Sequence, residues 1–188
     1  TNEAARPCQF RKLGAGTLQL NAFTSTFTGD VDVAEGVLVA AAGSAAECAS
    51  YSTLGHPGVG RTITVYNGGE LVFGAQDTLG QLASPIKLST IISNGTFRLK
   101  DYSANGIGPI TFYDGQFIYN GGSAGSRVWG TLGFLGRVTL DGTQPYDWPA
   151  VGNNNRFSLG YADDFLIEPR DDGKTNYWGK TTFDVKDI

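Results

Sequence analysis

Several residue types that build catalytic and metal sites are scarce in this chain. Methionine is absent, histidine occurs once and cysteine twice among 188 residues. The cysteines and His56 do not cluster at a spacing that would hold a metal, and no glycine-rich loop has the pattern that cradles a nucleotide phosphate. We therefore expect no metal and no cofactor.

Charge is also scarce, and it is not grouped. Charged residues make up 17% of the chain, the net charge is −4, and the lysines and arginines form no run. A nucleic-acid-binding surface needs a basic stripe that neutralises phosphates, so no nucleic-acid partner is expected. The best apolar run, residues 37–42, is six residues long, whereas a membrane-spanning helix needs ~18. We expect this segment not to span a membrane.

Glycine, in contrast, is abundant and periodic. The 27 glycines are about twice the usual share. Six of them are followed two positions later by Leu, Phe or Val in a short apolar strand, and these are Gly16, Gly36, Gly69, Gly95, Gly115 and Gly136. Successive members are separated by 20, 33, 26, 20 and 21 residues, a mean of 24. Such a period is typical of solenoids and repeat arrays.

Several of the repeats read as strand, tight turn, strand. Asn94-Gly95 and Asp114-Gly115 each lie between two short apolar strands, and Asn, Asp and Gly supply the positive φ angles of a sharp bend. Such a bend either closes an antiparallel hairpin or turns a corner between two faces of a parallel β-helix. Hairpin arrays place strands every 8–12 residues with no longer period. The longer period favours an all-β parallel β-helix.

The length sets the number of coils and the domain organisation. At the mean spacing, 188 residues hold roughly eight coils. We predict a single module over 1–188, with the best-matching repeat at 1–50, looser rungs at 51–142, and a loop-rich end at 143–188 that contains the start of the next rung. The first residue is not Met and 181–185 read as the opening of another strand, so we expect a fragment of a longer repeat protein.

A specific motif covers about 28 residues of the first repeat. It reads Lys12-Leu13-Gly14-Ala15-Gly16-Thr17-Leu18-Gln19-Leu20, then Thr26-Phe27-Thr28-Gly29, then Gly36-Val37-Leu38-Val39. This segment resembles the autotransporter-associated β-strand repeat, in which Lys-x-Gly-x-Gly-Thr-Leu-x-Leu precedes a loop and a Val-x-x-Gly-x-Leu strand. The resemblance implies a right-handed parallel β-helix that forms a passenger segment of a large bacterial protein.

The same resemblance implies a function. It is that of a non-enzymatic passenger or stalk module of a secreted or outer-surface bacterial protein, which serves adhesion or display at the cell surface or outer membrane. The expected partners are further repeats of the same parent chain and host-surface or extracellular glycans or proteins. The alternative is a carbohydrate-active β-helix enzyme, a lyase or glycoside hydrolase that acts on extracellular polysaccharide or mucin glycans with paired carboxylates.

Acidic and aromatic residues are densest towards the C-terminus. Rings there could stack on a sugar beside hydrogen-bonding acids, although Asp171-Asp172-Gly173 is also ordinary turn chemistry. The candidate glycan or calcium contacts are Tyr146, Trp148, Asp163, Asp164, Asp171, Asp172 and Trp178. No residue is assigned a catalytic role, and the single histidine, His56, is expected to be a loop residue without a partner.

The remaining assignments are structural. Seven glycines are assigned to turns of the coil, namely Gly14, Gly16, Gly36, Gly69, Gly95, Gly115 and Gly136. Cys8 and Cys48 flank the best repeat and could form a disulfide in an oxidising compartment. Closing a loop of that length would stabilise the fold by roughly 4 kcal/mol. The alternative is that they are two unrelated buried thiols.

Overall fold

Every regular element in the described part of the chain is a β-strand. The computed structural model describes residues 8–43, 51–79, 88–100, 104–119, 130–134, 137–141, 155–158 and 183–185. The first sheet contains β1 (Phe10–Lys12), β3 (Val31–Val33), β5 (Thr62–Val65), β7 (Ser89–Ser93), β10 (Ile110–Tyr113), β13 (Val138–Asp141) and β15 (Phe183–Val185). The second sheet contains β2 (Thr17–Leu20), β4 (Gly36–Ala40), β6 (Gly69–Phe73), β8 (Thr96–Leu99) and β11 (Gln116–Tyr119). The third sheet contains β9 (Ala104–Ile107), β12 (Gly130–Phe134) and β14 (Asn155–Ser158).

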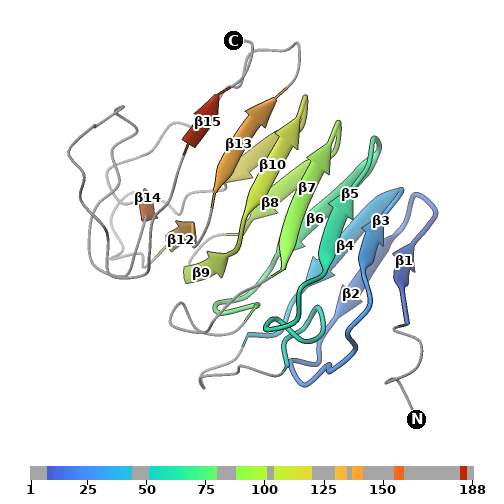
Figure 1. The fold of residues 1–188 in the computed structure, drawn as a ribbon. Helices are drawn as coiled ribbons and strands as arrows, with labels where there is room; N and C mark the ends of the chain where they lie inside the picture. The colour runs from blue at the N-terminus through green and yellow to red at the C-terminus, as the bar shows by residue number, and fades with distance from the viewer. Residues whose placement is uncertain are drawn as a thin grey trace.

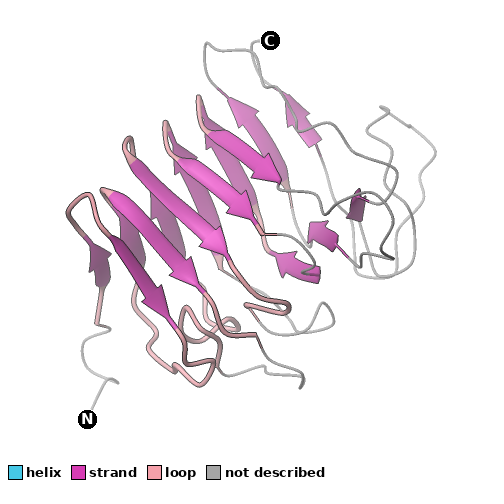
Figure 2. Cartoon of the chain, turned by 180° about the vertical axis from the view of Figure 1, so that it is seen from behind, coloured by secondary structure: helices cyan, strands magenta, loops and turns pink. Residues whose placement is uncertain are grey.

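Strands pair in parallel with the equivalent strand of the next coil. Val31 of β3, for example, lies in register with Phe10 on one side and with Ile63 on the other. The chain moves from the first sheet to the second before it returns, so strands that follow each other in sequence lie on different faces (Figures 1 and 2). Strands that are neighbours in sequence therefore form no hairpin among the described residues, and the prediction of a parallel β-helix is confirmed.

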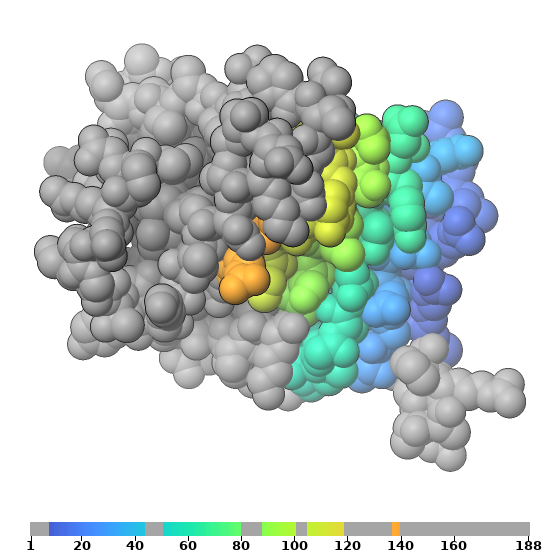
Figure 3. All heavy atoms as spheres, turned by 45° about the horizontal axis from the view of Figure 1, so that its top comes forward, coloured from blue at the N-terminus to red at the C-terminus, as the bar shows by residue number. Residues whose placement is uncertain are grey.

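The coils follow one another along one axis, but they differ in length. In the space-filling view they form adjacent bands in chain order (Figure 3). In the first sheet the separation between register partners is shortest from Thr90 to Ile110, at 20 residues, and longest from Val138 to Phe183, at 45 residues. That long interval explains why the first sheet has seven strands among the described residues, whereas the mean spacing indicated roughly eight coils.

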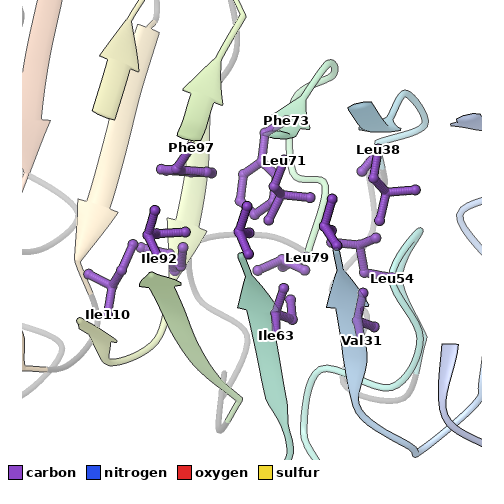
Figure 4. Packing of buried hydrophobic residues seen from close by; sticks show 14 of the residues in the cluster. Val31, Leu38, Leu54, Ile63, Leu71, Phe73, Leu79, Ile92, Phe97 and Ile110 are labelled. Atoms are coloured by element: carbon purple, nitrogen blue, oxygen red, sulfur yellow. The ribbon is translucent and has the colours of Figure 1, made fainter. Parts of the chain in front are cut away.

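The interior is filled by columns of side chains that stack from coil to coil. Because side chains alternate across a strand, each strand contributes its inward residues to the same column. The two columns of the first sheet are Phe10, Val31, Ile63, Thr90, Ile110 and Val138, and Lys12, Val33, Val65, Ile92 and Phe112. The two columns of the second sheet are Leu18, Leu38, Leu71, Phe97 and Phe117, and Leu20, Ala40, Phe73 and Leu99. Figure 4 shows residues of both sheets pointing towards one another.

Aromatic rings occupy the last three coils of the second sheet's columns. The rings of Phe73 and Phe97 lie edge to face with centroids 5.0 Å apart, and Phe97 stacks on Phe117 at 5.4 Å. Both arrangements are favourable for aromatic pairs and add to the free energy gained by burial. The three residues come from different coils, so their contacts join successive coils.

The third side of the coil begins as stacked loops and becomes a sheet at β9. The buried side chain of Asn105 marks the transition. Its Oδ1 accepts a hydrogen bond from the backbone N of Thr78 at 2.8 Å, and its Nδ2 donates to the carbonyl oxygen of Ala75 at 2.9 Å. Two leucines of these loops, Leu54 and Leu79, are fully buried. The amide of Asn105 thus replaces the ladder hydrogen bonds that the loop of the preceding coil lacks.

The first coil leaves apolar side chains exposed. Leu18 and Leu20 belong to the interior columns, but Leu18 is 38% exposed and Leu20 only half-buried. The reason is that β2 is the first strand of its sheet, so the column of Leu18 is covered on one side only. Its register partner one coil on, Leu38, is fully buried.

Thr90 is the one polar residue of its interior column. It is 1% exposed and its Oγ1 has no hydrogen-bond partner. A buried hydroxyl without a partner costs free energy because it has lost its hydrogen bonds to water. Its register partners Ile63 and Ile110 are both apolar.

We predict that Thr90→Val stabilises the protein. Valine has the shape of threonine without the hydroxyl, so the free energy of unfolding should rise by about 1–2 kcal/mol, measured by urea denaturation. Thr111→Val, on the outward face of β10, is the control and should change it by less than about 0.5 kcal/mol. A Thr90→Val protein no more stable than the wild type would mean that the hydroxyl is satisfied.

Candidate functional site

The periodic glycines form one column at the corner between the first and second sheets. Gly36 is in register with Gly69, and the neighbouring pairs place Gly16, Gly95 and Gly115 in the same column. We call this column, with the turn residues that precede it, the glycine corner. The short turns that join β5 to β6, β7 to β8 and β10 to β11 are visible in Figure 1.

Close approach of backbones explains every glycine of the column except Gly16, where an added Cβ meets no atom within 4 Å. A Cβ built on Gly69 would overlap the carbonyl oxygen of Val33 in the preceding coil. A Cβ built on Gly115 would lie 2.6 Å from the carbonyl oxygen of Ile92. Real Cβ atoms do not come this close to backbone, so a side chain at either position would push two coils apart.

The positive φ angles belong mostly to the residue before the column. They are found at Gly68 (84°), Asn94 (52°) and Asp114 (51°), and these residue types tolerate the left-handed conformation. The turn and the close approach are thus separate demands on adjacent residues. In the second coil Gly36 meets both, because its φ is 66° and its Cβ would clash with the carbonyl oxygen of Gly14.

The sixth sequence repeat has a different place from the other five. Gly136 lies outside the described residues, but Val138 two positions later begins β13 and pairs with Ile110. It therefore belongs to the first sheet, whereas the other five glycines lead into strands of the second sheet. The pattern of glycine followed by an apolar strand is common to both sheets, so sequence alone could not separate them.

Lys12 joins the corner of the first coil to that of the second. Its side chain is 6% exposed although it occupies an interior column. Its Nζ donates hydrogen bonds to the carbonyl oxygens of Leu13 at 3.0 Å, Gly14 at 2.5 Å and Glu35 at 3.0 Å. The three donors of a lysine ammonium are thereby all used. This explains physically why a lysine stands two residues before the first glycine of the motif.

Arg61 ties together the loops of two successive coils. Its side chain is 6% exposed and donates to the backbone carbonyl oxygens of Gly29 at 3.1 Å, His56 at 3.0 Å and Leu54. The guanidinium carbon also lies 5.2 Å from the ring centroid of Phe27, within cation–π range. Burial lowers the pKa of Arg61 to about 10, so the side chain remains charged at neutral pH. No sequence pattern indicated this role.

Asp77 is a buried carboxyl in the loop beneath the third sheet. It is 7% exposed and has a φ of 53°. Burial raises the pKa of Asp77, and the hydrogen bond that it accepts from Nε2 of Gln76 at 3.1 Å opposes that shift. Ionisation of this side chain is therefore less favourable in the folded protein than in the unfolded chain.

The described structure does not test the contact residues that sequence patterns predicted. Tyr146, Trp148, Asp163, Asp164, Asp171, Asp172 and Trp178 all lie outside the described residues. Cys8 is exposed and Cys48 also lies outside them, so their pairing stays a prediction. His56 is half-buried, and its Nδ1 accepts a hydrogen bond from the backbone N of Gly58 at 3.1 Å.

The described residues contain neither a metal cluster nor a membrane-spanning helix. No group of three or more His, Cys, Asp or Glu side chains is arranged there to hold a metal ion. None of the described elements is a helix long and apolar enough to cross a membrane. What the described residues do provide is a repeated, closely packed backbone corner.

Comparison with known proteins identifies one part of the chain. Residues 10–40 match the family model described as Passenger-associated-transport-repeat. No curated protein and no solved structure gives a match. The matched segment runs from β1 to β4 and includes Lys12 and the glycine corner of the first two coils, so this segment is similar to a passenger-associated transport repeat. The resemblance read from the sequence is confirmed.

We predict that Lys12→Met destabilises the protein although methionine suits an interior column. The change removes three charge-assisted hydrogen bonds and leaves the carbonyl groups of the corner unpaired, so the free energy of unfolding should fall by about 2 kcal/mol. Urea denaturation measures the change. Arg11→Met, one residue earlier on the exposed face of β1, is the control and should have little effect. If the two substitutions lowered the free energy of unfolding equally, the hydrogen bonds of Lys12 would not be what stabilises the corner.

Because the pKa of Asp77 is raised, we predict that Asp77→Asn increases the free energy of unfolding in a pH-dependent way. A carboxyl whose folded pKa is raised stabilises the fold fully below its unfolded pKa of about 3.9 and loses that contribution as pH rises through the folded pKa. Asparagine tolerates the left-handed φ and cannot ionise. The variant should therefore match the wild type near pH 3.5 and be more stable at pH 7, by chemical denaturation at both. A difference independent of pH would contradict the shift.

Proposed function

We propose that this chain is a non-enzymatic β-helical passenger module of a secreted or outer-surface bacterial protein, in which it serves as a stalk or an adhesive surface. The observation that carries the proposal is the continuous register of the coils, which extends from the segment that matches the passenger repeat into coils that do not match it. Five glycines and four interior columns keep this register from coil to coil. The same structural rule therefore governs the matched segment and the coils beyond it.

A solenoid of this kind suits display. Each coil contacts only its neighbours, so stability is close to a sum of coil and interface terms, and the structure extends without needing a larger core. The interior columns are closely filled, with residues such as Leu38, Leu71 and Phe97 fully buried. The surface available to partners is therefore the outside of the coil and its turns.

Further repeats of the same parent chain are proposed as the neighbours of this module. Among the described strands, β1 and β2 each have a pairing partner on one side only, and Leu18 of β2 is only partly covered. A preceding coil would pair with both strands and bury this residue. On this proposal residues 1–188 form one module, and its exposed edge is an internal junction of the parent protein.

The enzyme alternative gains no support from the structure. Its carboxylates, including Asp164 and Asp172, lie outside the described residues, and the family model that matches residues 10–40 describes a transport repeat. We therefore do not propose a lyase or hydrolase activity.

Surface display tests the proposal directly. The chain would replace the passenger of a well-characterised autotransporter, between its signal peptide and its outer-membrane barrel, in a Gram-negative host. We predict that the module reaches the cell surface, measured by antibody labelling of an N-terminal tag on intact cells and its loss after external protease. A Gly69→Val variant should reduce display severalfold, because its side chain would collide with the carbonyl oxygen of Val33.

Gly60→Ala is the matched control for this experiment. A Cβ at Gly60 meets no atom within 4 Å, so this variant should be displayed like the wild type. Retention of the wild-type chain inside cells that display the carrier's own passenger normally would contradict the proposed function.

A further inference from the structure

One column of side chains on the outer edge of the glycine corner alternates between bulky and small residues. In each of the first five coils, it contains the residue that comes directly after the last inward-facing residue of the first-sheet strand. These residues are Leu13, Ala34, Tyr66, Ser93 and Tyr113. We call this column the corner ridge. Its bulky members stand in the first, third and fifth coils, and its small members stand between them.

The bulky residues of the ridge are exposed. Leu13 is 63% exposed, Tyr66 41% and Tyr113 42%. They are three of the five large hydrophobic residues that are exposed in the described part of the chain. Exposed apolar side chains that are grouped on a surface mark sites of interaction more often than scattered ones do.

The backbone fixes the spacing of the ridge. Neighbouring strands lie about 4.8 Å apart, so Tyr66 and Tyr113, two coils apart, start from backbone positions about 10 Å apart. The backbone N of Tyr66 donates to the carbonyl oxygen of Val33 at 2.9 Å, and the carbonyl oxygen of Tyr113 accepts from the backbone N of Asn94 at 2.8 Å. A ligand that lies along the ridge would therefore contact a bulky side chain at every second coil, with a gap over Ser93.

The spacing of about 10 Å between the two tyrosines can be compared with the repeat distances of the regular polypeptide conformations. A bound β-strand presents the same face every two residues, about 6.7 Å, and an α-helix every turn, about 5.4 Å. A polyproline II helix has three residues per turn and a rise of 3.1 Å, so it presents the same face about every 9.3 Å. Only the last of these repeats matches two rungs of the β-helix.

The chemistry of the ridge fits the same ligand. Proline-rich segments dock on aromatic side chains, and a polyproline II helix has no internal hydrogen bonds, so its carbonyl groups need donors from outside. Tyrosine hydroxyls and the exposed side chains of Asn67 and Asn94 beside the ridge are such donors. The net charge of −4 disfavours polyanions as ligands.

We infer that the corner ridge binds a proline-rich partner segment in the polyproline II conformation, aligned with the axis of the β-helix, with prolines three residues apart in the gaps over Ala34 and Ser93. The inference rests on the proposed display function, because a surface module must meet its partner from outside. It names extended proline-rich polypeptide as the class of partner.

A binding experiment on the whole chain tests the inference. Fluorescence anisotropy with a labelled decaproline peptide should show saturable binding, and a Gly-Ser peptide of the same length should not bind. Tyr66→Ala and Tyr113→Ala should each weaken binding about tenfold. Ser93→Leu should weaken it as much, because the gap is filled while both rings remain. The three side chains are exposed or half-buried, and circular dichroism checks that each variant folds.

Phe23→Ala is the matched control, because Phe23 has the same exposed fraction as Tyr66, 41%, and lies off the ridge. It should bind like the wild type. Binding of decaproline that survives the double substitution of both tyrosines would overturn the inference, as would no binding at all. Binding of cellohexaose but not of decaproline, lost in Tyr113→Ala, would overturn it in favour of a glycan. None of these results alters the display measurement, so the two proposals fail separately.

Discussion

The structure depends on how closely the backbones of successive coils approach at the glycine corner. At Gly69 a carbonyl oxygen of the preceding coil occupies the place of a Cβ, and the corresponding glycines one and two coils on face the same constraint. If one coil shifted by a residue, inward and outward side chains would exchange faces, because the period of a strand is two. The corner thus fixes the register on which every interior column depends.

The interior columns convert that register into stability. Leu38, Leu71 and Phe97 are buried because each lies over its equivalent in the next coil. Burial of this kind is worth about 1.5–3 kcal/mol for each such side chain, and it is shared between neighbours. The consequence is visible at Leu18, which has a coil on one side only and remains 38% exposed. The polar side chains of Lys12, Asn105 and Arg61 act where the backbone leaves this regular pattern, by pairing carbonyl or N–H groups that no ladder satisfies.

Much of the fold could be predicted from the sequence, because glycine spacing and apolar alternation are direct results of the corner and the columns. The separate roles of adjacent turn residues could not, since both Asn94 and Gly95 are ordinary turn residues until the neighbouring coil is known. Arg61 was missed for a similar reason. Its partners include the backbone carbonyl oxygens of Gly29 and His56. Any residue type can supply such an acceptor, so the sequence gives no sign of it. The contacts proposed between 146 and 178 lie outside the described residues, and that part of the site remains a prediction.

Because the interior of the coil is filled, a partner can bind only to side chains on its outside. The distance between successive coils sets the spacing of those side chains. Tyr66 and Tyr113 occupy one column because the turns that follow β5 and β10 begin at the same register position. One residue more or less in either strand would exchange the inward and outward side chains beyond it, so it would disturb that alignment together with the interior columns. The corner ridge is therefore a consequence of the constraint that fixes the glycines. Substitution on the ridge should alter what the surface presents while the columns behind it stay unchanged, because exposed residues contribute little to burial.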